Sequence, residues 1–315
     1  MVIDAVTMKA IRYHSHGGPE VLQVEKVPRP KPAKHEVLVR VHAAGVNPGD
    51  WQIRSGLAGN RFPLPYIPGW DVSGVVEEVG PGSSLFRVGD EVFGMTADSG
   101  ACAEYVAVPE SQLAHKPAAL SHVQAAAVPM SSFTAWHSLN KQGRLQAGET
   151  VIVNGAAGGV GHFAVQLAKQ AGARVIGVTS GRNADFVRGL GAGEVLDYTA
   201  APLEGTPWQA DLAIDTIGGP NGDMLLETLR SGGRLVPVTF GHYNAEKAAA
   251  RNVTVNEVQL LQISKTTLET IANMFDKGDL RVALDMVVPL EETRRAHERS
   301  ESRRARGKIV IEISR

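Results

Sequence analysis

Residues 154–169 read NGAAGGVGHFAVQLAK and follow the apolar run TVIV at 150–153. An apolar strand, a glycine-rich turn and a helical pattern in this order are typical of a dinucleotide-binding fold, in which the turn holds a pyrophosphate at the start of the helix. Alanine stands at the first fingerprint position, which needs only a slightly wider turn. We therefore expect a phosphate cradle formed by Ala156, Gly158, Gly159, Val160 and Gly161. The alternative is a turn that is rich in glycine only for packing.

The two sides of this stretch differ in pattern. Strands alternate with helices after it, which predicts a parallel sheet with helices on both faces. Residues 8–120 contain short apolar runs separated by turn residues, which predict a compact barrel or sandwich. The runs VALDMVVPL and GKIVIEI near the end of the chain are again strand-like. We expect an α/β protein in which a nucleotide-binding domain, 126–277, is inserted into a domain formed by 1–125 and 278–315.

Composition excludes several classes of protein. The 315 residues carry a formal net charge of −1, which argues against a binder of nucleic acid backbones. We expect the basic cluster Arg294–Arg306 to be a solvated helix face. No apolar run reaches the ~18 residues of a membrane span, and the first residues do not resemble a signal peptide. With Cys102 as the single cysteine, we expect a cytoplasmic protein without a disulfide or a membrane segment.

The residues after the second strand of the alternating region predict the cofactor. An acidic residue there would bind the ribose 2′-hydroxyl of NAD. The sequence instead has Ser180, Arg182 and Asn183, and a guanidinium can bind a 2′-phosphate through two parallel hydrogen bonds. We therefore expect NADP(H). The alternative is that Arg182 is a surface residue and Asn183 caps the next helix.

Several segments together resemble one family. GETVIVNGAAGGVGHFAVQLAK, VLVRVHAAGVNPGDWQIRSG, IPGWDVSGVVEEVG, VGDEVFG and GKIVI are similar to the quinone oxidoreductase/zeta-crystallin branch of the medium-chain dehydrogenases/reductases. The resemblance covers essentially the whole chain. It implies a GroES-like β-barrel domain plus a doubly wound parallel-sheet Rossmann domain, with the active site in the cleft between them. It also implies a homodimer formed through the sheet edge near residues 254–258.

The same resemblance bears on zinc. Zinc-dependent relatives place a cysteine in the segment matching AAGVNPGD and a His-Glu pair at the segment matching GWD. Here those places hold Asn47, Trp70 and Asp71, so we expect no metal. Oxidising an alcohol is difficult without a Lewis acid, whereas hydride donation to an electron-poor acceptor is easier. We therefore expect NADPH-dependent reduction of a small quinone or another α,β-unsaturated carbonyl.

Further site residues follow from the resemblance alone. It places Asn47 beside the nicotinamide, Thr134 at the nicotinamide end of the cofactor and Tyr198 near the adenosine phosphate. It also places the segments containing Ile217, Val238 and Phe240 around the nicotinamide and its ribose. Asn47 could instead stabilise its turn, and Thr134 could be a helix residue bonded to its own backbone.

Trp51 stands near the place where some of these reductases carry a proton-donating tyrosine. It could shape an aromatic pocket or be part of the core, and water could then donate the proton.

Three alternatives stay open. The enzyme could be an enoyl reductase acting on a carrier-bound or biosynthetic intermediate. It could also be a catalytically idle NADPH-binding protein. Tyr243 and Lys247 have the Tyr-x-x-x-Lys spacing of short-chain dehydrogenases, but in those proteins the glycine turn opens the chain, whereas here it follows a whole β domain.

Overall fold

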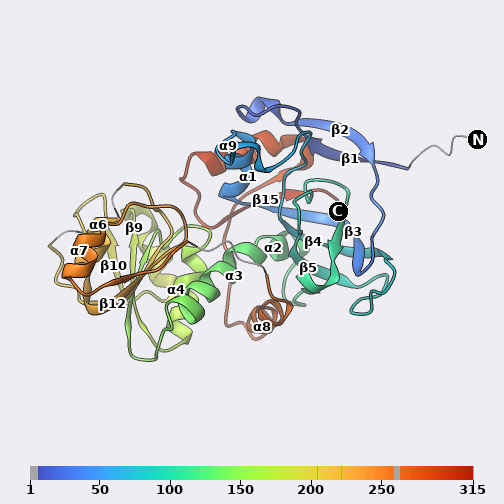
Figure 1. Cartoon of the computed structure of the whole chain (residues 1–315). Coiled ribbons are helices and arrows are strands. Elements are labelled where there is room, and N and C mark those ends of the chain that lie inside the picture. The colour runs from blue at the N-terminus through green and yellow to red at the C-terminus, as the bar shows by residue number, and fades with distance from the viewer. Residues whose placement is uncertain (1–5, 204, 221, 259–262, 315) are drawn as a thin grey trace, which may run out of the picture. The chain divides into compact units, whose positions relative to one another are not determined.

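The computed structural model describes residues 6–203, 205–220, 222–258 and 263–314. The chain divides into two compact units (Figure 1). Unit 1 consists of Met1–Met130, Ile263–Gly278 and Val282–Arg315, and unit 2 consists of Ser131–Gln262 and Asp279–Arg281.

One segment groups differently from the predicted domain boundary. Residues 263–278 belong to unit 1 rather than to the nucleotide-binding domain. The reason is that helix α8 (Lys265–Asp276) packs against strand β7 (Leu113–His115). The Asp276 carboxylate also accepts a hydrogen bond from the backbone N–H of Ala119 at 3.0 Å.

Unit 1 is built around a seven-stranded sheet and a separate hairpin. The sheet order is β14-β15-β3-β4-β5-β7, with β6 also paired to β3, and β1 and β2 form the hairpin. Buried side chains such as Val39, Val72 and Ile309 form its apolar core. The strands are β1 (Thr7–Arg12), β2 (Gln23–Pro28), β3 (Glu36–Val46), β4 (Asp71–Val79), β5 (Glu91–Met95), β6 (Tyr105–Pro109), β7, β14 (Leu284–Pro289) and β15 (Lys308–Glu312).

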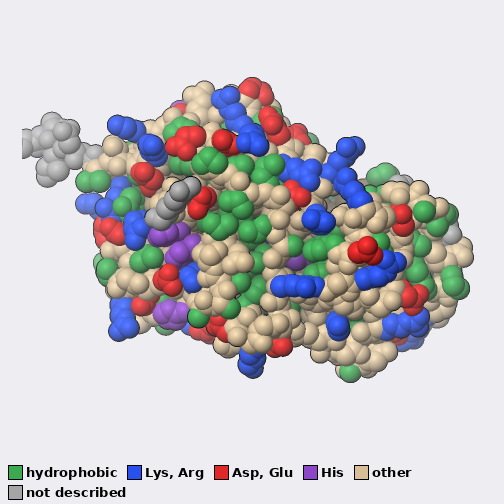
Figure 2. Space-filling model, turned by 180° about the vertical axis from the view of Figure 1, so that it is seen from behind, with side chains coloured by type: hydrophobic (Ala, Val, Ile, Leu, Met, Phe, Trp, Pro, Cys, Tyr) green, Lys and Arg blue, Asp and Glu red, His purple; other side chains and the backbone are tan. Residues whose placement is uncertain are grey.

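The helices of unit 1 include the predicted basic one. Besides α8 they are α1 (Pro48–Arg54), α2 (His122–Ala126) and α9 (Thr293–Glu301). On α9, Arg294 donates to the backbone carbonyls of Glu20 and Leu22, and Arg299 donates two hydrogen bonds to Asp285. On the face drawn in Figure 2, Lys and Arg side chains lie interspersed with Asp and Glu. Partners within the chain thus already engage these arginines.

Unit 2 contains the predicted doubly wound parallel sheet. Its six strands follow the order β10-β9-β8-β11-β12-β13. The chain leaves β8 and β11, which are neighbours, toward opposite faces, and ligands of such sheets bind at the carboxyl ends of the strands near this point. The strands are β8 (Thr150–Asn154), β9 (Arg174–Thr179), β10 (Glu194–Asp197), β11 (Ala210–Asp215), β12 (Leu229–Pro237) and β13 (Thr254–Val255).

The helices of unit 2 form two pairs. α4 (Gly161–Gln170) packs against α5 (Ala184–Leu190), and α6 (Asp223–Glu227) packs against α7 (Ala245–Ala250). Figure 1 shows α6 and α7 on the other side of the sheet from α4. The chain enters this unit through α3 (Pro129–His137). Among the described residues, no helix is both long enough and apolar enough to cross a bilayer.

Candidate functional site

The glycine turn after β8 requires glycine at two positions. Gly155 has φ +79°, and a Cβ on it would lie 2.3 Å from Oγ1 of Thr216. A Cβ on Gly161 would lie 2.1 Å from the carbonyl oxygen of Gly155. Gly155 therefore makes the tight turn, although the sequence spacing assigned the first fingerprint position to Ala156. Ala156 is buried and donates its N–H to the Val178 carbonyl at 3.0 Å.

Gly158 has a different environment. Among the described residues other than its chain neighbours, an ideal Cβ there would meet one heavy atom, the carbonyl oxygen of Gly155, at the short distance of 3.3 Å. The Gly158 carbonyl accepts the N–H of His162, the second residue of α4, at 3.0 Å, so Gly158 lies at the helix N-terminus, where the helix dipole favours an anion. Gly159 and Val160 complete the turn and are half-buried. Because Gly158 and Gly159 carry no side chain, a phosphate group could approach the backbone of the turn at the helix N-terminus.

The loop after β9 brings together the residues predicted to select the cofactor. The N–H of Asn183 donates to the Ser180 carbonyl at 2.8 Å, and its side-chain amide donates to Oγ of Ser180 at 3.4 Å. Asn183 is the N-cap residue of α5, but its side chain makes no capping hydrogen bond. The side chain of Arg182 is exposed. A cation and a hydroxyl therefore share this loop.

An acidic residue that the sequence analysis missed lies beside this loop. Asp197 pairs with Thr179 in the parallel register of β10 and β9. A Cβ on Gly181 would lie 2.3 Å from Oδ2 of Asp197. Hydrogen bonds from the Thr199 side chain and backbone lower the pKa of Asp197, which favours its negative charge. The next residue, Tyr198, is 58% exposed.

Asp215, at the carboxyl end of β11, organises the next loop. It is 1% exposed and accepts hydrogen bonds from the Ile217 and Gly218 amides at 3.0 and 3.2 Å. It also accepts from the Asn154 side chain at 2.9 Å and from the Tyr243 hydroxyl at 2.7 Å. One buried carboxylate thus joins the ends of β8 and β11 to the loop that follows β12.

That following loop presents apolar side chains to solvent. Val238 donates its N–H to the Asp215 carbonyl at 2.8 Å, and Gly219 donates to the Phe240 carbonyl at 3.0 Å. Phe240 is 83% exposed and Ile217 is 55% exposed. Two large apolar side chains are thus exposed on two loops that are hydrogen-bonded to each other.

The Tyr243–Lys247 spacing does not produce a catalytic pair. Lys247 forms an ion pair with Glu227 at 2.6 Å, whereas the Tyr243 hydroxyl donates to Asp215. Burial, together with the Asp215 charge, raises the pKa of Tyr243, the opposite of what a catalytic tyrosine requires. The remaining predicted residue of this unit, Thr134, is half-buried on α3.

In unit 1, Asn47 belongs to a buried charged network. Its side-chain amide donates to Oδ2 of Asp71 at 3.0 Å, and its Oδ1 accepts from the Lys308 ammonium at 2.6 Å. Lys308 also lies 3.4 Å from Oδ2 of Asp71. Asn47, Asp71 and Lys308 are each at most 3% exposed. Burial raises the pKa of Asp71, and the ammonium opposes that shift. Lys308 was missed because a lysine at the start of a strand looks like a surface residue.

A second buried carboxylate completes the network. Asp50 accepts the Asn47 backbone N–H at 2.8 Å and the Gly69 N–H at 3.0 Å. Burial raises its pKa to about 7 against these two hydrogen bonds. Trp51, the next residue of α1, is 7% exposed, and the guanidinium of Arg303 lies 5.8 Å from its ring centroid. The side chains of Asp50 and Trp51 are therefore both enclosed within unit 1.

Asn47 and Asp71 stand at positions that correspond to zinc ligands in the zinc-dependent relatives. Asn47 and Asp71 bond the Lys308 ammonium, so a cation already occupies their oxygens and these residues do not fit a zinc ion. Elsewhere in the described ranges, no group of three or more His, Cys, Asp or Glu is arranged to hold a metal.

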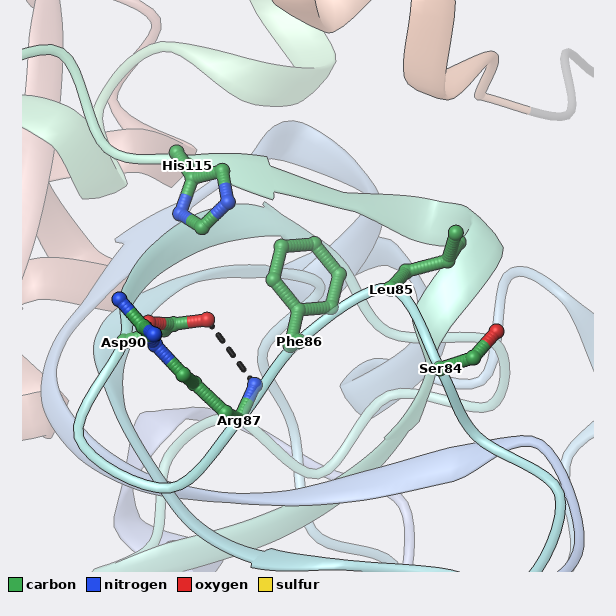
Figure 3. A pocket seen from close by; sticks show the side chains of 6 residues that line it. All are labelled: Ser84, Leu85, Phe86, Arg87, Asp90 and His115. Atoms are coloured by element: carbon green, nitrogen blue, oxygen red, sulfur yellow. Dashed lines mark hydrogen bonds and ion pairs between the residues drawn. The ribbon is translucent and has the colours of Figure 1, made fainter.

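One pocket of unit 1 lies apart from all of these residues. Figure 3 shows the Phe86 ring facing His115, with Arg87 and Asp90 at one side. Arg87 donates its N–H and its side chain to the Asp90 carboxylate. None of the predicted site residues lines this pocket.

Comparison with known proteins identifies the family. Residues 33–118 match the family described as "Alcohol dehydrogenase GroES-like domain", and residues 190–311 match "Zinc-binding dehydrogenase". The "Chloroplast envelope quinone oxidoreductase homolog" of Arabidopsis thaliana is 32% identical over 323 residues, which cover 97% of this chain and 98% of that protein.

Two solved structures match over the same extent. The Escherichia coli quinone oxidoreductase complexed with NADPH superposes with a TM-score of 0.88 and 28% identity, covering 96% of this chain and 99% of that one. A structure named "NAD-dependent alcohol dehydrogenase" gives a TM-score of 0.90 and 32% identity over 98% of this chain and 100% of its own. The predicted pairing of a GroES-like domain with a Rossmann domain is confirmed. The chain therefore belongs to the medium-chain dehydrogenase/reductase superfamily of oxidoreductases, in its quinone oxidoreductase branch.

Proposed function

We propose that this protein is an NADPH-dependent reductase that transfers hydride to a quinone or another activated α,β-unsaturated carbonyl without zinc. One observation carries the proposal: the glycine turn, the Ser180–Asn183 loop and the loops held by Asp215 all follow carboxyl ends of strands in one parallel sheet. Bound NADPH would supply the hydride. The protein would hold the pyrophosphate at Gly158–Gly161, the adenosine end near Arg182 and Tyr198, and the nicotinamide end near Thr134, Ile217, Val238 and Phe240.

Zinc independence rests on Lys308. Because its ammonium bonds both Asn47 and Asp71, the Asp71 carboxylate has a counter-charge without a metal. The reaction then depends on an acceptor that is already electron-poor, which favours quinones and enones over unactivated carbonyls or alcohols. The family description "Zinc-binding dehydrogenase" does not fit these positions.

The proton would come from water. Asp50 has a pKa of about 7, which suits a proton donor, but both of its oxygens accept backbone hydrogen bonds and it is 1% exposed. The indole of Trp51 has no proton acidic enough to donate near neutral pH. For Asn47 the hydrogen bond between its backbone N–H and Asp50 supports a positioning role at the start of α1, and for Trp51 burial supports a place in the core.

Substitutions of Arg182 and of Asp197 should shift the preference between NADPH and NADH in opposite directions. Arg182→Ala should weaken NADPH binding about 10- to 100-fold and leave NADH nearly unaffected, because a hydrogen bond to a charged group contributes ~1.5–3 kcal/mol. Asp197→Asn should strengthen NADPH relative to NADH, because it removes a negative charge next to the loop. Titration of both variants with both cofactors measures the two ratios. If neither ratio moves, the 2′-phosphate is recognised elsewhere.

The reaction is tested by NADPH oxidation with a panel of quinones, small enones and enoyl thioesters. Turnover with quinones or enones supports the proposal, whereas turnover confined to enoyl thioesters indicates an enoyl reductase. Tight NADPH binding without turnover indicates an idle binding protein. If NADPH neither changes the protein fluorescence nor raises the melting temperature, all three functions are excluded.

We also propose a cytoplasmic homodimer. Strand β13 lies at the edge of the sheet and pairs with β12 alone among the described residues, and exposed edges favour pairing. The single cysteine, Cys102, is buried, which suits a reducing compartment. Light scattering at micromolar concentration should give twice the chain mass, and a monomer mass would contradict the dimer.

A further inference from the structure

Beyond the carboxyl ends of β12 and β13, unit 2 has a pocket of about 280 Å³. We propose that this pocket binds an uncharged apolar substituent of the acceptor, such as a short alkyl or prenyl chain, and so selects substituted neutral acceptors. This inference rests on the proposed function. The pocket is lined by Pro237, Phe240, Tyr243, Asn256, Glu257 and Val258.

The position of the pocket links it to the proposed hydride-transfer site. Phe240 lines the pocket and also belongs to the loop that is bonded to Gly219. Tyr243 lines it and donates its hydroxyl to Asp215, the carboxylate that holds the Ile217 and Gly218 amides. The pocket wall and the proposed nicotinamide loop are therefore anchored to the same buried residue. An acceptor beside that loop could extend a substituent into the pocket.

The chemistry of the lining favours an apolar occupant. Phe240 exposes 83% of its surface, and Pro237 and Val258 add aliphatic groups. The Tyr243 hydroxyl is already bonded to Asp215, so the tyrosine offers mainly its ring. Glu257 is an exposed carboxylate at the pocket, and it would repel an anionic substituent.

The size of the pocket limits the occupant to part of a molecule. Sites for whole drug-sized ligands span roughly 300–1,000 Å³, and about 280 Å³ lies just below this range, which suits part of an acceptor. An apolar acyl chain would fit this lining as well as an alkyl substituent does, so the choice between quinones and enoyl thioesters rests on the turnover panel.

The test is a series of 1,4-benzoquinones with straight alkyl substituents of increasing length. For the unaltered protein, kcat/KM should rise about three- to fourfold per added methylene until the pocket is full, and then level off. Val258→Trp fills the pocket and should flatten this dependence. The matched control is Val88→Trp, an exposed position of unit 1, which should keep it. Glu257→Gln should raise the rate with a carboxylate-ended substituent relative to the neutral chain of equal length.

The possible outcomes distinguish a failure of the pocket proposal from a failure of the proposed function. If the unsubstituted quinone is reduced but chain length has no effect, or if Val258→Trp keeps the full dependence, the pocket proposal is wrong while the function stands. A change from dimer to monomer in Val258→Trp with an unaltered dependence would assign the pocket to a subunit interface and also overturn it. If Val258→Trp does not fold, Phe240→Ala replaces it and should reduce the gain per methylene. Absence of any quinone reduction would instead contradict the proposed function.

Discussion

Lys308→Met should lower the free energy of unfolding by about 3–5 kcal/mol, the usual cost of removing one partner of a buried ion pair. The ammonium lies 2.6 Å from Oδ1 of Asn47 and 3.4 Å from Oδ2 of Asp71. Without it, Asp71 must remain charged in an apolar interior or take up a proton. Urea denaturation followed by circular dichroism measures the loss.

Two further variants make this prediction specific. Lys247→Met removes a lysine that forms an ion pair with Glu227, and both side chains are about one-third exposed. This substitution should lower the free energy of unfolding by less than ~1 kcal/mol. Adding Asp71→Asn to Lys308→Met should recover part of the stability, because it removes the unpaired buried charge. Equal losses for Lys308→Met and Lys247→Met would show that the buried network contributes no more than a surface pair.

Gly158→Glu should weaken NADPH binding by at least about 100-fold and leave the fold intact. A Cβ at Gly158 would lie 3.3 Å from the carbonyl oxygen of Gly155, a tight contact that a small backbone shift relieves, so the loss of stability should stay near ~1 kcal/mol. A carboxylate there would face the cofactor pyrophosphate, and such like-charge contacts cost several kcal/mol. Fluorescence titration with NADPH and thermal unfolding measure the two effects separately.

Two other glycines provide the comparison. Gly193→Glu introduces the same side chain at an exposed position just before β10, at the amino edge of the sheet, and should not affect binding. Gly161→Ala should reduce both binding and stability, because its Cβ would lie 2.1 Å from the Gly155 carbonyl oxygen. Normal NADPH affinity in Gly158→Glu would mean that the turn is rich in glycine only for packing.

The sequence predicted the strongly patterned parts of this fold. The alternation of strands and helices after residue 150 gave the parallel sheet, because each element has a clear period. The short helices α1 and α7 were not predicted, since six or seven residues carry too little periodicity. The glycine turn was found, but the spacing rule pointed to Ala156, and only the backbone geometry identifies Gly155 as the tight-turn residue.

The unpredicted parts of the site depend on contacts between distant segments. Lys308 and Asn47 are 261 residues apart in sequence, and no local pattern indicates that they meet. Asp197 is the last residue of β10, whereas Ser180 follows β9, and the two meet only through the register of β10 with β9. A search for acids limited to the residues just after β9 therefore missed it.

Strand β3 imposes an order on the assembly of the chain. It pairs with β4, β6 and β15, and β15 follows the whole of unit 2 in the sequence. Its last partner is therefore synthesised only after unit 2. Unit 2 is nearly contiguous and can fold as soon as residues 131–262 have left the ribosome. On the ribosome the nucleotide-binding half can thus be in place while the β half still exposes an unpaired edge, which is the stage at which aggregation is favoured.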